Sequence, residues 1–305
     1  MRAFIFPFFI PVGVEYRTRR FPIVTFAVMG ICVAVHLYSI FRWAAAGFDP
    51  DVSYEFMVSM GFVAGEPRLL GLLTHLFTHA DIFHLLGNMI YLFLFGSCVE
   101  DLLGRWRFVL FYLLGGMASV GVYVALAPAP VQGADMIPLV GASGAISACM
   151  GGFLLVLHHT RITIKWVVII LVRVFSGDWH LPAKLVMSFW FLSDVLGMVL
   201  SSEESGGGVA FSAHVGGFIA GIALIAVIRS GWGLLTDAEV EQLNAGGEED
   251  ALDHCPATVY LLVNRQQLGP FTRAQILEMR QIGSIEPDAL FWEEGMDDWR
   301  GLDYL

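Results

Sequence analysis

The sequence contains few charged residues. Asp, Glu, Lys and Arg make up 15% of its 305 residues, whereas a water-soluble domain averages about 25%. Hydrophobic residues make up 56%, and the mean hydropathy is +0.68. This composition excludes an ordinary soluble globular protein and indicates a chain that spans a membrane.

Cysteine is also scarce, and its four positions form no C-x-x-C pair and no spacing typical of a disulfide framework. Cys32, Cys98 and Cys149 lie in apolar runs, and Cys255 lies near the C-terminus. We therefore expect free thiols or core packing. The first ten residues have no small-residue cleavage site, so we expect no removable signal peptide.

Basic residues are few, and the acidic excess is confined to the C-terminal part. Residues 1–235 contain 13 Lys or Arg and 13 Asp or Glu, whereas residues 236–305 contain 4 and 15, which accounts for the net charge of −11. These counts predict a membrane domain at 1–235, an acidic linker at 236–255 and a small domain at 256–305. Such an acidic region disfavours binding to nucleic acid or to anionic lipid.

Six segments are apolar and long enough to span a bilayer, which takes about 20 residues. They are 22–45, 82–103, 107–128, 142–159, 182–200 and 211–230. We therefore predict an all-α polytopic membrane domain of six helices. A seventh apolar run, Trp166–Val172, is too short to span, and we expect it to lie along the inner membrane interface.

The distribution of Lys and Arg predicts the orientation. With the N-terminus inside, 11 basic residues lie on the inner side, and only Arg42 and Arg68 lie on the outer side. Because basic residues accumulate on the cytoplasmic side, we expect both termini in the cytoplasm. Segments 82–103, 142–159 and 211–230 then begin at the same depth, near the outer surface.

Polar residues occur at the start of these three segments. A histidine inside a membrane segment is costly and usually has a function or a partner, and a neutral imidazole can take the proton of a serine hydroxyl. Ser143 and His214 are therefore candidates for nucleophile and general base. His84 and Asn88, four residues apart on one helical face, and the backbone amide of Ser143 could donate hydrogen bonds to an oxyanion.

Small residues accompany the candidate pair. Gly141 and Gly144 flank the serine, and Gly217 and Gly221 follow the histidine with the spacing of close helix packing. We expect segment 211–230 to pack against segment 142–159 and so bring His214 to Ser143.

Each polar residue also has a structural interpretation. A Gly-Ala-Ser-Gly run alone is more often helix packing, a lone histidine is more often hydrogen-bonded, and Asn88 could simply join helices. Asp194 could orient His214, gate substrate entry or be a solvated acid near the interface. His75 and His79 have the spacing of a zinc-protease helix, but Leu76 stands where that motif needs Glu. We therefore predict no metal site and no cofactor.

Several stretches occur in the order found in one known family. They are His75–His79, His84–Asn88, Gly96–Glu100 with Gly104, Gly141–Ala145, Trp190–Leu192, and Ala213–Gly217 with Gly221. Over roughly residues 20–230 the chain resembles the rhomboid family of intramembrane serine proteases.

The resemblance implies a six-helix rhomboid bundle and a catalytic dyad without a carboxylate. It implies Ser143 as nucleophile, His214 as base, and His84, Asn88 and the Ser143 amide as oxyanion hole. The implied substrates are single-pass membrane proteins in the lipid bilayer, cut near the outer end of the transmembrane helix. Many members have an aromatic residue one turn after the serine, packed on the base, whereas this chain has Ser147.

Residues 256–305 have the pattern of a small α+β cytoplasmic domain. We predict a strand at Val259–Val263, a turn at Gly269-Pro270, a helix at Thr272–Ile282 and a strand at Pro287–Trp292. The region resembles bacterial GYF-like modules through Gly269–Phe271 and Trp292–Trp299.

This second resemblance implies a protein or peptide partner and a bacterial inner membrane. The candidate binding residues are Tyr260, Phe271, Trp292 and Trp299, since polyproline peptides bind to aromatic grooves. The alternative is that these side chains form the core of the small domain.

Two other functions remain alternatives for the membrane domain. A non-catalytic chaperone of the same fold would typically lack the serine or the histidine, and this chain has both. A transporter would have internal repeats or broken helices with ion ligands, and neither is evident.

Overall fold

The computed structural model describes residues 5–126, 138–170, 173–200, 210–232 and most of 259–302. Within the last range the gaps are 264–265, 272–274, 277–278, 281–283, 286–288, 294–295 and 297. The predicted linker 236–255 and most of the predicted helix Thr272–Ile282 lie outside the described residues. The chain divides into two compact units, Met1–Asn244 and Ala245–Leu305.

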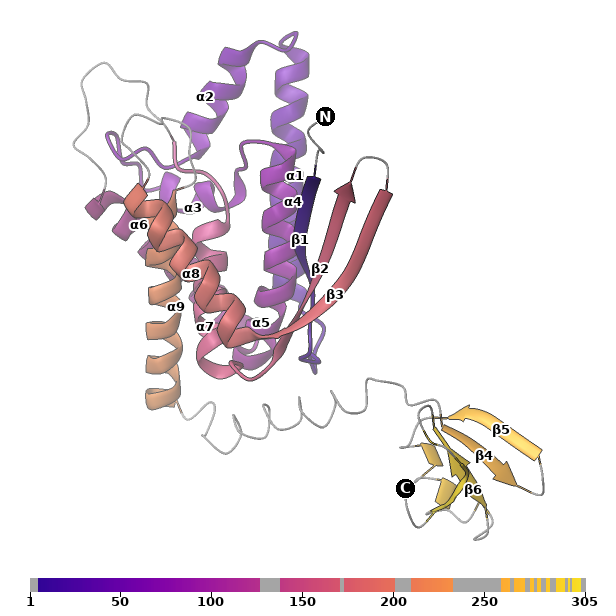
Figure 1. The fold of residues 1–305 in the computed structure, drawn as a ribbon. Helices are drawn as coiled ribbons and strands as arrows, with labels where there is room; N and C mark the ends of the chain where they lie inside the picture. The colour runs from indigo at the N-terminus through magenta and orange to yellow at the C-terminus, as the bar shows by residue number, and fades with distance from the viewer. Residues whose placement is uncertain are drawn as a thin grey trace. The chain divides into compact units, whose positions relative to one another are not determined.

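The first unit is mostly helical (Figure 1). Its helices are α1 (Ile23–Ala45), α2 (Pro50–Met60), α3 (Gly71–Thr74), η1 (His75–Phe77), α4 (Ile82–Tyr91), the π-helical η2 (Leu92–Gly96), α5 (Ser97–Leu103), α6 (Arg105–Leu126), α7 (Ser143–Val156), α8 (Ala183–Leu200) and α9 (Phe211–Trp232).

Five helical stretches among the described residues are long and apolar enough to cross a membrane. They are Ile23–Ala45, Ile82–Leu103, Arg105–Leu126, Ala183–Leu200 and Phe211–Arg229. The segment predicted at 142–159 corresponds to α7, which is apolar but has only 14 residues. The prediction of a helical, multi-pass membrane protein is confirmed.

Helix α7 lies at the centre of the helical bundle. It packs against α9, α6 and η2, and 11 of its 14 residues are buried. A helix that is apolar all round belongs either in lipid or in a protein core, and the burial of α7 places it in the core. The first residue of this central helix is Ser143, so the candidate nucleophile belongs to the most enclosed part of the fold.

A buried carboxylate in the first turn of α5 holds the start of α1. Glu100 accepts hydrogen bonds from the backbone amides of Val24 (3.0 Å) and Thr25 (2.7 Å) and from the Thr25 hydroxyl (2.8 Å). The first amides of a helix have no partner inside that helix, so the Glu100 carboxylate caps α1 from another element.

The neighbouring carboxylate, Asp101, holds the chain that leads into α1. It accepts hydrogen bonds from the Tyr16 hydroxyl (2.8 Å), the Arg20 amide (3.0 Å) and the Arg19 guanidinium (3.5 Å). Burial, together with the hydrogen bond to Asp101, raises the pKa of Tyr16. The two carboxylates thus fasten the N-terminal segment to one end of the bundle.

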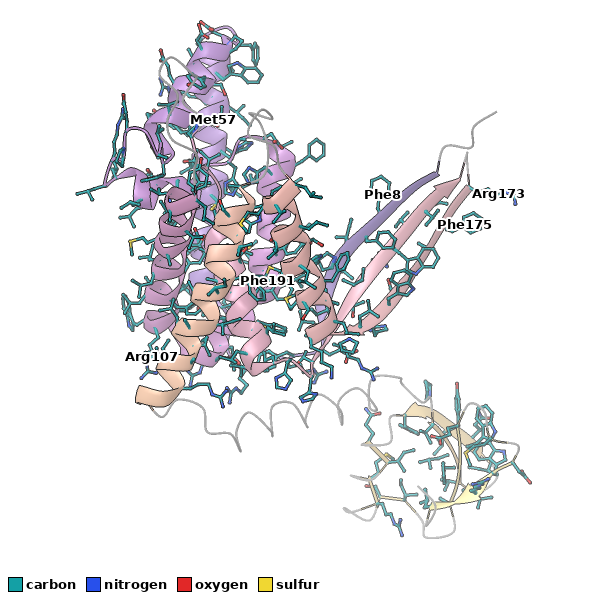
Figure 2. All side chains as sticks on the ribbon, turned by 60° about the vertical axis from the view of Figure 1, so that its left-hand side comes forward. Phe8, Met57, Arg107, Arg173, Phe175 and Phe191 are labelled. Atoms are coloured by element: carbon teal, nitrogen blue, oxygen red, sulfur yellow. The ribbon has the colours of Figure 1, made fainter. Side chains whose placement is uncertain are left out.

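A three-stranded antiparallel sheet, which the sequence analysis did not predict, joins segments far apart in the chain. Its strands are β1 (Ile5–Val14), β2 (Arg161–Ile170) and β3 (Arg173–Pro182), in the order β1-β2-β3. The run expected along the inner interface, Trp166–Val172, is therefore mostly part of strand β2. One end of the sheet, with Phe8, Arg173 and Phe175, stands away from the helices (Figure 2).

One face of this sheet carries an aromatic cluster. Phe9 pairs with Trp166 across β1 and β2, and Ile164 pairs with Trp179 across β2 and β3. The rings of Phe9 and Trp179 stack with centroids 5.5 Å apart. Cross-strand aromatic pairs of this kind stabilise a sheet.

The second unit contains a four-stranded sheet in the order β5-β4-β6-β7. Its strands are β4 (Val259–Val263), β5 (Gln266–Phe271), β6 (Leu290–Trp292) and β7 (Arg300–Gly301). The predicted turn at Gly269-Pro270 is wrong, because both residues belong to strand β5. The chain stays extended there and adapts through a positive φ at Gly269, opposite a ladder irregularity between Val259 and Leu261.

The four aromatic candidates of this unit lie in different surroundings. Phe271 packs against the core cluster around Leu261 and Phe291. The rings of Tyr260 and Trp292 lie 6.1 Å apart on neighbouring strands, and the Trp292 indole donates a hydrogen bond to the Met296 carbonyl. Trp299 is half-buried. Phe271 is thus partly buried against the core of the small domain.

Removing the Glu100 carboxylate should destabilise the bundle. The Glu100→Ala variant leaves the Thr25 amide and hydroxyl without their acceptor, and each buried polar group without a partner costs about 1–3 kcal/mol. We expect a loss of about 3 kcal/mol in unfolding free energy, measured by thermal or denaturant unfolding in detergent. Glu100→Gln keeps one acceptor oxygen and should lose less. An Ala variant as stable as the wild type would contradict this role.

Candidate functional site

The loop that leads into α7 is held by backbone hydrogen bonds. Phe62 and Leu139 exchange two of them, at 2.9 and 2.8 Å, and the Gly141 amide donates to the His75 carbonyl at 2.9 Å. These bonds fix the residues just before Ser143 against the segments before and within η1. The position of Ser143 therefore depends on backbone contacts that leave its hydroxyl free for other partners.

Gly141 brings the Ser143 hydroxyl and the His84 imidazole to the same place. Its φ is +116°, and a Cβ at this position would lie 2.7 Å from His84 Nε2 and 3.8 Å from Ser143 Oγ. Any larger residue would be strained and would collide with the imidazole. The glycine two residues before the serine is thus required by both the backbone angle and the nearness of His84.

His84 is held by the first turn of α4. Asp81 caps this helix and accepts hydrogen bonds from the amides of Phe83 (2.8 Å) and His84 (2.9 Å). The His79 ring meets the His84 ring edge to face at 5.2 Å. Burial lowers the pKa of His79 to about 4, so this neighbour is neutral at pH 7.

Asn88 lies one turn further along α4, on the same face as His84. Its side-chain amide donates to the His84 carbonyl at 2.8 Å, and its Oδ1 is buried without a hydrogen-bond partner among the described residues. A buried acceptor without a protein partner commonly binds an ordered water molecule or a ligand.

The backbones of α7 and α9 touch at several glycines. A Cβ on Gly217 would collide with the Gly144 carbonyl, and a Cβ on Gly221 would collide with the Ala148 carbonyl. A Cβ on Gly144 would lie 3.9 Å from the Ala213 carbonyl, just before His214. The first turn of α7, which begins with Ser143, therefore packs against the turn of α9 that carries His214, as expected from the small residues.

His214 meets an acidic partner from α8. Its Nδ1 lies 3.4 Å from Asp194 Oδ1, and the two side chains are 18% and 28% exposed. His214 is also near enough to His84 for the two imidazoles to interact electrostatically. Of the interpretations open for Asp194, this contact favours the orientation of His214.

His75, one of the two histidines with the spacing of a zinc-protease helix, has a structural role. His75 Nδ1 donates to the Gly71 carbonyl at 2.9 Å, and burial lowers the pKa of His75. Within the described part of the chain, no three His, Cys, Asp or Glu side chains are grouped so that they could hold a metal ion.

Two contributors to the site did not emerge from the sequence. Asp81 caps the helix of His84, and the signal was available, because Asp immediately before an apolar helical run is a typical N-cap. Ser119 of α6 fills the space beside Gly144 and donates to the Gly116 carbonyl at 2.7 Å. Nothing in the spacing of Ser119 could have revealed that contact.

Comparison with known proteins agrees with this architecture. Residues 66–231 match the model of the Rhomboid domain, and residues 260–303 match that of GYF domain 2. The first match covers more than half of the chain, so the protein belongs to the rhomboid family, whose members are usually intramembrane serine proteases.

Individual relatives are similar over part of their length. RHOMBOID-like protein 12, mitochondrial, of Arabidopsis thaliana is 32% identical over 187 residues, which are 57% of this chain and 50% of the relative. Putative rhomboid protease YdcA of Bacillus subtilis is 32% identical over 142 residues, 45% of this chain and 63% of the relative. Rhomboid protease GluP of the same bacterium is 26% identical over 137 residues, 45% and 25%. The chain thus spans less than two thirds of each of these relatives.

Increasing the separation of α7 and α9 should lower the thermal stability of the protein. Gly221→Ala places a methyl group against the Ala148 carbonyl, and overpacking of this kind costs about 1–3 kcal/mol. We expect lower thermal stability in detergent. Gly121→Ala is the matched control, because the space around Gly121 on α6 is open. Equal stability of the two variants would show that the helices do not need this close approach.

Proposed function

We propose that this protein hydrolyses peptide bonds in the transmembrane segments of single-pass membrane proteins. The observation that carries the proposal is the packing of α7 on α9 at Gly144 and Gly217, which sets the turn of Ser143 against the turn of His214. A serine hydroxyl becomes an effective nucleophile when a neutral imidazole is within hydrogen-bond reach. The proposal agrees with membership of a family of serine proteases.

In the proposed first half-reaction, the Ser143 hydroxyl attacks the carbonyl carbon of the scissile bond while His214 Nε2 takes its proton. The tetrahedral intermediate then collapses, and His214 gives this proton to the leaving amine. The result is an acyl-enzyme, in which Ser143 carries the amino-terminal part of the substrate as an ester, and a released carboxyl-terminal fragment with a new free amine. In the second half-reaction, His214 deprotonates a water molecule, which attacks the ester and restores the serine.

The negative charge of the intermediate needs donors at the same place. Ser143 is the first residue of α7, where backbone amides are unpaired and the helix dipole favours negative charge. His84 Nε2 lies beside the same glycine as Ser143 Oγ, and Asn88 is on the same face of α4. We therefore assign the oxyanion hole to the Ser143 amide, His84 and Asn88. Removing one such donor typically costs 10²–10³ in kcat.

The distribution of basic residues supports an orientation with both termini in the cytoplasm of a bacterial inner membrane. In this orientation the site lies in the outer half of the bilayer, and the substrate must reach it there. Unwinding a transmembrane helix inside lipid is costly, because its backbone hydrogen-bonding groups find no partners there. The outer end of such a helix, near water, is therefore the part most readily unwound and cut. The GYF-like domain would meet a protein or peptide partner on the cytoplasmic side.

Substitution of the nucleophile tests the proposal. The purified protein in liposomes should cleave a reporter transmembrane substrate and react with a fluorophosphonate, and Ser143→Ala should do neither. Ser147→Ala removes another hydroxyl from the same helix and should keep the activity. Equal cleavage by the wild type and by Ser143→Ala would overturn the proposed mechanism.

The orientation is tested by fusions. Alkaline phosphatase is active only outside the cytoplasm, so a fusion after Gly47, behind α1, should be active and a fusion after Leu305 should be inactive. A green fluorescent protein at the same two sites should give the opposite pattern. Active phosphatase at the C-terminus would reverse the proposed topology and move the site to the inner side.

A further inference from the structure

The geometry points to Asp194 as a positioning residue for His214: we propose that its carboxylate accepts the Nδ1 proton of His214 and so keeps Nε2 free to act as the base toward Ser143. This inference rests on the proposed roles of Ser143 and His214. The carboxylate would make a dyad into an arrangement with the logic of a Ser-His-Asp triad, built across three membrane helices.

The contact is held in register by the packing above and below it. On one side of the pair, the ring of Phe211 fills the space beside Gly197, where a Cβ would lie 2.6 Å from it. On the other side, the rings of Phe191 and Phe218 stack with centroids 4.8 Å apart. Figure 2 labels Phe191 on α8.

These contacts follow the antiparallel course of the two helices. Along α9, the three contacts are made by Phe211, His214 and Phe218, each about one turn after the last. Their partners on α8 are Gly197, Asp194 and Phe191, which follow in the opposite direction. Residues three and four apart share one face of a helix, so all three contacts lie in one row. A glycine fitted to an aromatic ring and a stacked ring pair leave little room for α8 to slide. Asp194 is therefore kept opposite His214 by its neighbours on both sides.

A third helix, α4, packs against α8 beside these contacts. Tyr91 of α4 packs on Trp190 with ring centroids 4.8 Å apart. Trp190 lies one turn before Asp194 on α8. Helix α4 also carries His84 and Asn88, so the element that holds the proposed oxyanion donors also borders the proposed carboxylate.

The chemistry of the contact favours one tautomer of His214. An ionised carboxylate can only accept a hydrogen bond, so the nitrogen that faces it must carry the proton. The other nitrogen, Nε2, is then unprotonated and available as a base. The separation of 3.4 Å is long for a charged hydrogen bond, and catalytic hydrogen bonds often shorten when the substrate binds.

A conservative series of variants tests the inference. Asp194→Asn keeps the size but can donate from its amide to Nδ1, which places the proton on Nε2 and blocks the base. We expect kcat and the rate of fluorophosphonate labelling of Ser143 to fall about 10²- to 10⁴-fold, with KM within about twofold and an unchanged melting temperature. Asp194→Glu keeps the charge and should recover part of the loss. Ser193→Ala, on the exposed side of α8, is the control and should behave as the wild type.

Combining Asp194→Asn with His214→Ala distinguishes positioning of the imidazole from a general structural effect. In the His214→Ala background, Asp194→Asn should cause no further loss of the residual labelling rate. If Asp194→Asn keeps the wild-type kcat, or lowers the residual rate equally without the imidazole, the inference is overturned.

A second measurement does not depend on activity. In ¹⁵N spectra of histidine-labelled protein in lipid, the signal that His214→Ala removes should be that of an Nδ1-protonated imidazole, and Asp194→Asn should convert it to the Nε2-protonated form. An Nε2-protonated His214 in the wild type would overturn the inference. A wild-type protein that neither cleaves nor labels would overturn the proposed protease function instead, whatever this spectrum shows.

Discussion

The close approach of α7 to α9 is the constraint on which the site depends. Lipid gives helices no hydrophobic reason to associate, so membrane helices pack through small residues that let backbones touch. Here Gly217 and Gly221 lie against the carbonyls of Gly144 and Ala148. Because these contacts leave no space for a side chain, they fix both the separation of the helices and their register, and hence the heights of Ser143 and His214.

The other elements act on that pair from outside. Gly141, bonded to the His75 carbonyl, sets the turn before the serine and admits the His84 ring. Helix α8 presents Asp194 to the far nitrogen of His214. At the opposite end of the bundle, Glu100 and Asp101 fasten the N-terminal segment. Ser143 and His84 thus lie in the first turns of their helices, where hydrogen-bond partners or water can reach polar groups.

Much of this arrangement could be predicted from the sequence, for physical reasons. Five spans followed from apolar length alone, and the candidate residues stood out because polar side chains are costly in membrane segments. The β1-β2-β3 sheet was missed, because pairing between Phe9 and Trp166 joins positions far apart and runs apolar on both faces carry no alternation. The contact of Asp194 with His214 depends on the register of α8 against α9, which no local pattern contains. The turn predicted at Gly269-Pro270 failed because tertiary pairing kept the chain in a strand.

The most direct test is an experimental structure of the fluorophosphonate-treated protein in a lipid bilayer. We expect a single phosphonyl group bonded to Ser143 Oγ, with one oxygen directed toward the Ser143 amide, His84 and Asn88. We also expect His214 Nε2 within about 3.2 Å of the serine oxygen. Modification of another residue, or an adduct on Ser143 with the His214 ring on a different side of the bundle, would contradict it.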